Sequence, residues 1–227
     1  MGPEERATTP GPGLSGAVAS LVRRLTARPA GGPGPTVVGI DGRSGGGKST
    51  LAAALQAAAD GEDGGPGPVT VIQGDEFYAG GSAATWDRRT AVERADLVVD
   101  WRRQRTVLAQ LRTHGTAAWH PFDWDAPDWD SDDVPLAPEP VVARATPVVV
   151  LEGAYSCRPE LHDLLDLRVL LDVPDDVRRR QLRAREGEEY RVDWEARWSA
   201  AEDHYFGAVM PPDRFDLVVG PGRVADG

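Results

Sequence analysis

Short apolar runs alternate with helical stretches along this chain. The apolar runs have the composition of buried parallel strands and lie at 36–41, 69–72, 147–153, 167–173 and 215–219. Helix-favouring residues, or apolar residues at helical spacing, predict helices at 14–27, 49–59, 89–113, 178–189 and 194–206. Strands separated by helices indicate an α/β fold with three layers, in which helices cover both faces of a five-stranded parallel sheet.

Composition shifts along the chain predict its organisation. Residues 1–13 are rich in Gly, Pro and charge, which is typical of a disordered N-terminal tail. The remainder, 14–227, has the size of a single α/β domain. Gly- and Pro-rich connections lead into the first two strands, and the segment 115–142, with many Asp, Trp and Pro residues, is predicted to be irregular.

A phosphate-binding loop lies between the first predicted strand and the helix that follows. Residues 42–49 satisfy the pattern GxxxxGK[ST], and Lys48 is the only lysine among 227 residues. A compact ammonium reaches between the β- and γ-phosphates, which a broad guanidinium cannot do. The loop amides and the helix N-terminus direct partial positive charge at the phosphates of ATP. The predicted ATP-binding residues are Gly42, Ser44, Gly45, Gly46, Gly47, Lys48, Ser49 and Thr50.

Three acidic residues fall at the carboxyl ends of predicted strands, where parallel sheets bind ligands. Asp41 directly precedes the loop and is interpreted mainly as a carboxylate that shapes it. Glu152 ends an apolar run and, with the Ser49 hydroxyl, is the candidate Mg²⁺ site, because a buried carboxylate needs a cation. Asp75 is the candidate general base that accepts the proton of an acceptor hydroxyl.

The segment 119–133 combines tryptophans with carboxylates, a composition that suits a pocket wall for a sugar, nucleobase or amine, although a surface loop is the plain alternative. Trp194, Trp198 and Tyr205 are assigned to helix packing rather than ligand contact, and Glu202 is left undecided. The candidate acceptor-binding residues are Asp75, Tyr78, Asp87, Trp119, Phe122, Asp123 and Trp124.

Taken together, these segments resemble the uridine kinase-like P-loop kinases, which are related to phosphoribulokinase. The resemblance rests on residues 40–52, 74–78, 122–124, 148–155, 167–186 and 215–220, in the family's order. It implies that Asp75 is the catalytic base, that 122–124 line the acceptor pocket, and that an arginine-rich lid closes over ATP. The arginines of this lid are Arg178, Arg179, Arg180, Arg183 and Arg185. The lid would use Arg178 to bind ATP, and Arg180 and Arg183, with Lys48, to stabilise the transferring phosphoryl group; a solvated helix face is the alternative. The tryptophans depart from the family's pyrimidine-binding pattern, so the acceptor is left open.

The net charge and the cysteine count limit the classes of partner and the cellular compartment that the sequence favours. A formal charge of -11 argues against nucleic acid or an anionic membrane as a partner, and a single cysteine fits a cytoplasmic protein. The sequence thus predicts an ATP- and Mg²⁺-dependent kinase whose partner is a small molecule with a free hydroxyl, and it leaves a homo-oligomer open. A nucleoside monophosphate or sugar-phosphate kinase, and a regulatory nucleotide switch, are the alternatives. The switch is less favoured because the NKxD motif that reads guanine needs a second lysine.

Overall fold

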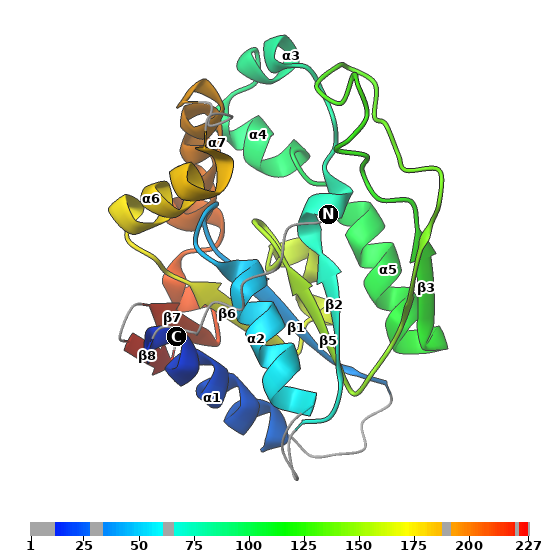
Figure 1. The fold of residues 1–227 in the computed structure, drawn as a ribbon, viewed down its shortest axis with the longest axis vertical. Helices are drawn as coiled ribbons and strands as arrows, with labels where there is room; N and C mark the ends of the chain where they lie inside the picture. The colour runs from blue at the N-terminus through cyan, green and yellow to red at the C-terminus, as the bar shows by residue number, and fades with distance from the viewer. Residues whose placement is uncertain (1–11, 28–33, 61–65, 188–191, 221–222, 227) are drawn as a thin grey trace, which may run out of the picture.

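The main sheet of the protein has six strands in the order β2-β5-β1-β6-β7-β8 (Figure 1). The computed structural model describes residues 12–27, 34–60, 66–187, 192–220 and 223–226. Neighbouring strands from β2 to β7 run parallel, as predicted, and β8 pairs antiparallel with β7. The sixth strand was not predicted; it follows β7 after only two residues, a connection too short for a parallel crossover. The strands are β1 Thr36–Asp41, β2 Val69–Gln73, β5 Val148–Glu152, β6 Leu167–Leu171, β7 Leu217–Gly220 and β8 Arg223–Asp226.

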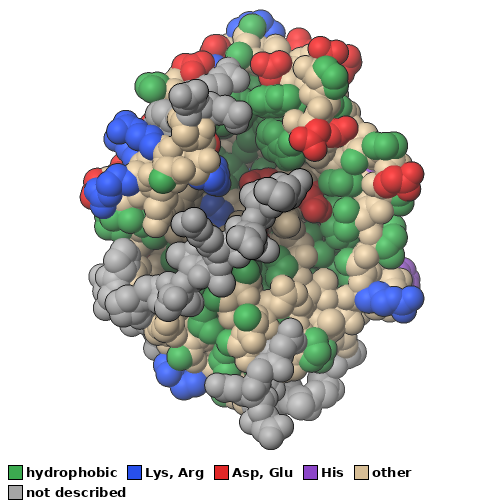
Figure 2. Space-filling model, in the orientation of Figure 1, with side chains coloured by type: hydrophobic (Ala, Val, Ile, Leu, Met, Phe, Trp, Pro, Cys, Tyr) green, Lys and Arg blue, Asp and Glu red, His purple; other side chains and the backbone are tan. Residues whose placement is uncertain are grey.

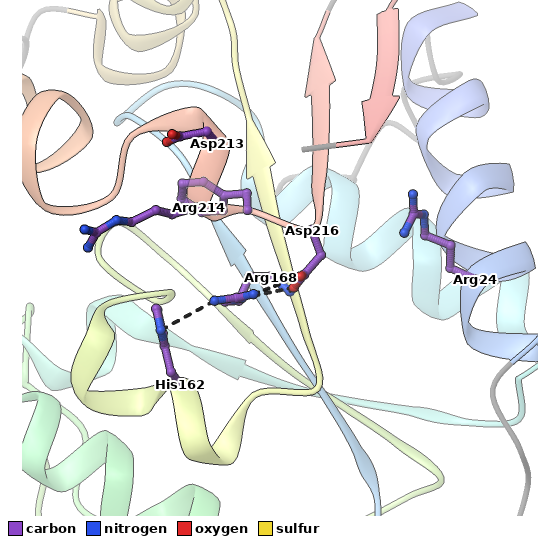
Figure 3. A pocket seen from close by; sticks show the side chains of 7 residues that line it. Arg24, His162, Arg168, Asp213, Arg214 and Asp216 are labelled. Atoms are coloured by element: carbon purple, nitrogen blue, oxygen red, sulfur yellow. Dashed lines mark hydrogen bonds and ion pairs between the residues drawn. The ribbon is translucent and has the colours of Figure 1, made fainter.

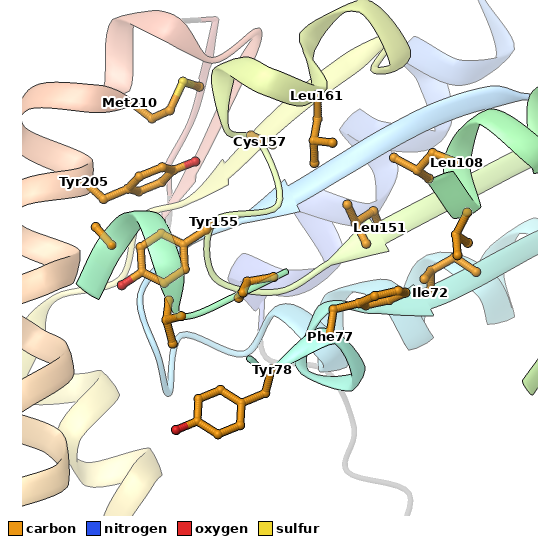
Figure 4. Packing of buried hydrophobic residues seen from close by; sticks show 14 of the residues in the cluster. Ile72, Phe77, Tyr78, Leu108, Leu151, Tyr155, Cys157, Leu161, Tyr205 and Met210 are labelled. Carbon is orange, nitrogen blue, oxygen red and sulfur yellow. The ribbon is translucent and has the colours of Figure 1, made fainter. Parts of the chain in front are cut away.

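Two apolar clusters, one on each face of the sheet, make the three predicted layers. Alternate residues of β1 belong to different clusters. Val38 packs with α1 (Pro12–Thr26) and α2 (Lys48–Asp60), whereas Val37 packs with α5 (Trp101–His114). This follows from the two-residue period of a strand that is buried on both faces. Figure 4 shows part of the second cluster, in which Leu151 of β5 lies near Leu108 of α5. None of the described helices has the length and apolar character needed to cross a membrane.

Several predicted boundaries differ from the structure. The helix predicted at 14–27 begins at Pro12, and the predicted disorder of residues 1–11 lies outside the described part of the chain. The stretch predicted as one helix at 89–113 is two helices, α4 (Ala91–Leu97) and α5, because Thr90 and Asp100 each provide an N-cap. A short helix, α3 (Ala83–Asp87), precedes them.

The segment predicted to be irregular at 115–142 contains part of a second, two-stranded antiparallel sheet. It pairs β3 (Thr116–Trp119) with β4 (Val141–Arg144). The last two long helices are α6 (Asp175–Glu186) and α7 (Val192–His204), which lie together on one side of the carboxyl ends of the strands (Figure 1).

Asp41 fixes the two loops that meet at the end of β1. Its Oδ1 accepts hydrogen bonds from the amides of Gly42 and Tyr155, and its Oδ2 accepts from the Cys157 amide and the Tyr205 hydroxyl, at 2.8–2.9 Å. These bonds hold Tyr155 in a left-handed conformation, with φ of 66°, that a side chain rarely adopts. Asp41 is thus a carboxylate that shapes loops, as its position before the P-loop suggested.

We expect Tyr205→Phe to destabilise the protein more at pH 7.5 than at pH 5. Burial raises the pKa of Asp41 to about 6, while hydrogen bonds, including the one from Tyr205, act to lower it. A bond that lowers a pKa stabilises the ionised form, so its contribution is present above that pKa and fades as the pH falls through it. Urea unfolding at neutral pH should show that Tyr205→Phe has a free energy of unfolding about 1.5–3 kcal/mol lower than the wild type, the usual range for a hydrogen bond to a charged group.

Tyr155→Phe is the matched control, because the Tyr155 hydroxyl is buried and has no hydrogen-bond partner in the described structure. This role of Asp41 would be contradicted if both variants lowered the free energy of unfolding equally, or if the decrease for Tyr205→Phe did not depend on pH.

Candidate active site

The P-loop connects β1 to the N-terminus of α2, which begins at Lys48. The first amides of a helix have no partner within the helix, and here they follow a glycine-rich turn, so they can bind phosphate oxygens. Gly47 needs the freedom of glycine, because its φ of 89° is left-handed. The Lys48 ammonium donates to the Arg43 carbonyl at 3.2 Å, so it folds back over the loop. This geometry is that of a phosphate-binding loop.

Helix α6 packs directly on the P-loop at Gly45. A Cβ placed on Gly45 would lie 2.6 Å from the Arg178 carbonyl oxygen and 2.5 Å from Leu182 Cγ. Only glycine therefore fits between the loop and this helix. The contact brings the arginine-rich segment to the edge of the phosphate site.

Ser49 and Glu152 meet beside Lys48. The Ser49 hydroxyl donates to Glu152 Oε1 at 2.9 Å, and Glu152 is 5% exposed. Burial raises the pKa of Glu152, and the nearby Asp75 adds to that rise, whereas Ser49 and Lys48 act against it. Hydroxyl and carboxylate oxygens are ligands that suit Mg²⁺, and a cation here would offset the cost of the buried charge. The two side chains fit the predicted magnesium site.

Asp75 lies just past the end of β2, in a short 3-10 turn (Gly74–Phe77). Its side chain lines a pocket of about 500 Å³ that also reaches Ser44 of the P-loop. In Figure 2, hydrophobic side chains gather around a hollow in the upper half of the molecule, with acidic groups beside it. A carboxylate on the wall of a pocket that opens to the P-loop is in the position that a general base requires.

Aromatic rings form much of the pocket wall. Tyr78 stacks on Trp124 with ring centroids 5.0 Å apart, and Trp124 contacts Trp129 at 5.5 Å. Trp129 in turn meets Trp194 of α7 at 5.7 Å. All four side chains line the pocket, so the rings form a continuous surface from the end of β2, across 124–129, to α7.

Four predicted acceptor residues are not among those that line this pocket. Trp119 faces inward from β3, where its indole N–H donates to Glu76 at 2.7 Å, and Phe122 packs behind Tyr78 and Trp124. The Asp123 carboxylate accepts from the amide two residues ahead, as in a local turn. Asp87 binds Arg197 of α7 at 2.7 Å. The predicted residues that do line the pocket are Asp75, Tyr78 and Trp124.

The predicted lid arginines divide between two faces of α6. Arg178 and Arg185 line the pocket together with Leu182, at the spacing i, i+4, i+7 of one helix face. Arg180 pairs with Asp176 on an exposed face, and Arg183 is likewise exposed; neither is among the lining residues. Arg178 is buried and bonds Asp175 at 2.7 Å, which fixes its guanidinium.

Helix α7 contributes pocket residues that the sequence did not assign to ligand contact. Trp194 and Trp198 line the pocket, although Trp198 also packs edge-on against Trp86, so the expected packing role is only part of its environment. Glu202, undecided from the sequence, binds the P-loop: its Oε1 accepts from the Ser44 amide and hydroxyl, each at 2.7 Å. The spacing 194, 198, 202 was the available signal, because it marks one helix face.

A second pocket, of about 590 Å³, lies at the amino ends of β6 and β7, away from the P-loop (Figure 3). Arg168 makes a bidentate contact with Asp216 there, at 2.8 and 3.0 Å, and its guanidinium lies 3.4 Å from His162. The pair joins two neighbouring strands and largely balances its own charge, which favours a structural role for this region.

Comparison with known proteins agrees with this geometry. No protein-family model matches the chain. A uridine kinase from Limosilactobacillus reuteri (strain DSM 20016) is 29% identical over 146 residues, which are 63% of this chain and 62% of that protein. A uridine kinase from Clostridium novyi (strain NT) is 26% identical over 187 residues, 78% of each chain. The chain is similar to uridine kinases, and the predicted resemblance is confirmed.

The solved structures support the fold. A protein described as a possible uridine kinase from Bacillus stearothermophilus superposes with a TM-score of 0.65 and 22% identity, over 91% of this chain and 98% of that one. A D-glycerate 3-kinase from Cryptococcus neoformans superposes with a TM-score of 0.61 and 13% identity, over 96% of this chain and 100% of that one. The protein therefore has the P-loop kinase fold. The chain matches 62% of the length of the uridine kinase from Limosilactobacillus reuteri.

Proposed function

We propose that the protein is an ATP- and Mg²⁺-dependent kinase that transfers the γ-phosphoryl group to a hydroxyl of a small molecule. The observation that carries this proposal is one shared cavity: Ser44 of the P-loop, Asp75 and the aromatic wall line the same pocket. A kinase must bring the γ-phosphoryl and the acceptor hydroxyl together away from bulk water, and a continuous cavity provides that meeting place.

Each group at the phosphate site has a distinct task in this reaction. Gly42 and residues 44–50 bind the phosphates of ATP, and Lys48 balances negative charge on the β- and γ-oxygens. Ser49 and Glu152 would hold Mg²⁺, which neutralises phosphate charge when bound. Asp75 accepts the proton of the acceptor hydroxyl, while the oxygen of that hydroxyl forms a bond to the γ-phosphorus. The bond from that phosphorus to the oxygen shared with the β-phosphate breaks, and ADP leaves.

The arginines of α6 are proposed to stabilise the transferring group. Arg178, buried between the P-loop and the pocket, is the best positioned to bind ATP. Arg180 and Arg183 remain predicted lid residues, and they would have to turn toward the phosphates as nucleotide binds. A guanidinium that meets the transferring phosphoryl lowers the barrier by matching its charge.

The acceptor is proposed to be uncharged or cationic: a nucleoside, a sugar or an amine-bearing metabolite. Four carboxylates line the pocket, at Asp75, Glu186, Glu195 and Glu202, against two arginines. Both arginines already pair with acids, Arg178 with Asp175 and Arg185 with Glu186. A phosphate or carboxylate on the acceptor would meet repulsion in this pocket, so the nucleoside monophosphate and sugar-phosphate alternatives are less favoured.

A screen for ADP release tests the proposal. Purified protein with Mg²⁺ and ATP would be assayed against nucleosides, sugars, aminoglycosides and vitamins. ADP release that depends on one class of hydroxylated compound supports the kinase. Nucleotide binding with no dependence on any compound would instead favour a regulatory switch.

We expect Trp124→Ala to raise the KM for the acceptor with little change in the KM for ATP. The Trp124 ring is 41% exposed and stacks on Tyr78, so one face can contact a ligand. Loss of an aromatic stacking surface costs about 1–3 kcal/mol, or roughly 5- to 150-fold in affinity. Trp101→Ala removes an indole outside the pocket and should leave both constants near those of the wild type. A larger change for ATP than for the acceptor would mean that Trp124 faces the nucleotide.

A further inference from the structure

One face of α7 lines the pocket over its whole length. Trp194, Trp198 and Glu202 lie at the spacing i, i+4, i+8, which aligns side chains along a helix. The face thus runs from the aromatic wall, near Trp129, to the P-loop at Ser44. A ligand that occupies the pocket would lie against indole rings along this face and reach a carboxylate at its inner end.

Glu202 is a buried carboxylate with half of its hydrogen-bonding capacity unused. It is 1% exposed, and Oε1 accepts from the two neutral Ser44 donors, whereas Oε2 has no partner among the described residues. No arginine or lysine of the described chain forms an ion pair with it. Arg43, the residue before Ser44, pairs instead with Asp203 at 2.6 Å. A buried charge without a cation is costly, so a function for the free oxygen is indicated.

From these observations we propose that the acceptor carries an amine, and that Glu202 binds its ammonium group against the rings of α7. The inference rests on the proposed kinase function and deepens it, because it names the substrate class. An ammonium at Oε2 would supply the missing cation, and the electron-rich faces of tryptophans attract such a group. It would also lie between Glu202 and the γ-phosphoryl, since Ser44 belongs to the P-loop, and so it would relieve their mutual repulsion.

The other lining carboxylates do not offer the same site. Glu186 pairs with Arg185 at 2.9 Å, and Glu195 pairs with Arg178 and Arg179 at 3.7 and 3.0 Å. Asp75 is exposed and is proposed to accept the proton. Glu202 is therefore the lining carboxylate that is both buried and without a cation in the described structure.

Glu202→Gln separates recognition of the amine from support of the P-loop. The amide oxygen of glutamine can accept both Ser44 bonds, while its NH₂ group replaces the free oxygen. The variant therefore removes the charge and replaces the unpaired acceptor oxygen with a donor, while both Ser44 bonds can be kept. Glu139→Gln is the matched control, because it makes the same substitution at an exposed glutamate that is not among the residues lining the pocket.

The experiment compares matched pairs of acceptors in which an amine replaces a hydroxyl, such as D-glucosamine with D-glucose and 3-aminopropanol with 1,3-propanediol. Binding to protein loaded with Mg²⁺ and a non-hydrolysable ATP analogue would be measured by calorimetry, and turnover by ADP release. We expect the amine to be preferred at least about tenfold in the wild type and in Glu139→Gln. Glu202→Gln should lose this preference without a matching change in ATP affinity.

The inference is wrong if no amine is preferred to its neutral partner, or if Glu202→Gln retains the preference. Failure of the kinase proposal would look different, since the wild type would then bind no Mg·ATP or would transfer phosphoryl to no acceptor. A parallel loss of ATP affinity in Glu202→Gln would assign the residue to the P-loop alone, and would also overturn the inference.

Discussion

Lys48→Arg is expected to lower kcat by roughly 10²–10³-fold or more while the protein stays folded. The ammonium folds over the loop and contacts the Arg43 carbonyl at 3.2 Å. A guanidinium is broader and planar, and it cannot reproduce the contacts of a compact point charge. The charge is unchanged by the substitution, so the loss would measure the shape of the cation rather than its sign. Turnover and the thermal unfolding midpoint of both proteins would be compared.

The matched control for this prediction is Arg144→Lys, the reverse exchange on an exposed position of β4. It should alter neither turnover nor stability. Near-normal kcat in Lys48→Arg would show that the lysine is not a phosphate ligand of the reaction, whatever the motif suggests.

Asp75→Asn is expected to reduce kcat by about 10²–10⁴-fold with a small effect on the KM for ATP, the range for loss of a positioned proton acceptor. The side chain lines the pocket that reaches Ser44, yet it belongs to β2's turn rather than to the P-loop. Substitution with asparagine keeps its size and polarity and removes its ability to take up a proton at neutral pH. Saturating both substrates isolates the chemical step.

Asp125→Asn serves as the control, since Asp125 is an exposed carboxylate outside the pocket lining. It should behave like the wild type. If Asp75→Asn also turned over at the wild-type rate, the base would lie elsewhere, and Asp123 would be the next residue to substitute.

The strands and the P-loop could be predicted from the sequence because their signals are local. The run 148–151 is apolar at every position, since the strand is buried on both faces, and the pattern GxxxxGK[ST] around Lys48 lies within eight consecutive residues. The sixth strand and the β3–β4 pair lacked such signals. Both are short antiparallel elements, and β3 and β4 each have exposed positions that weaken an apolar pattern.

The pocket wall was harder to predict because it depends on which face of each element turns inward. Trp119 and Trp124 belong to one tryptophan-rich segment, yet the first packs in the core on Phe77 and the second lines the pocket. Likewise, the arginine run indicated a helix, but the contact of Gly45 with Leu182 determines that Arg178 and Arg185 meet the pocket. These are tertiary contacts, and the local pattern of residues does not contain them.

The most direct test of the account is mass spectrometry of an acceptor that is active in the ADP-release screen. Each compound would be incubated with Mg²⁺, ATP and either the wild type or Asp75→Asn. The account predicts that the wild type adds one phosphoryl group to a hydroxyl, with one ADP formed for each acceptor modified, and that Asp75→Asn forms far less of both. ATP hydrolysis without a phosphorylated acceptor, or equal product from the two proteins, would contradict it.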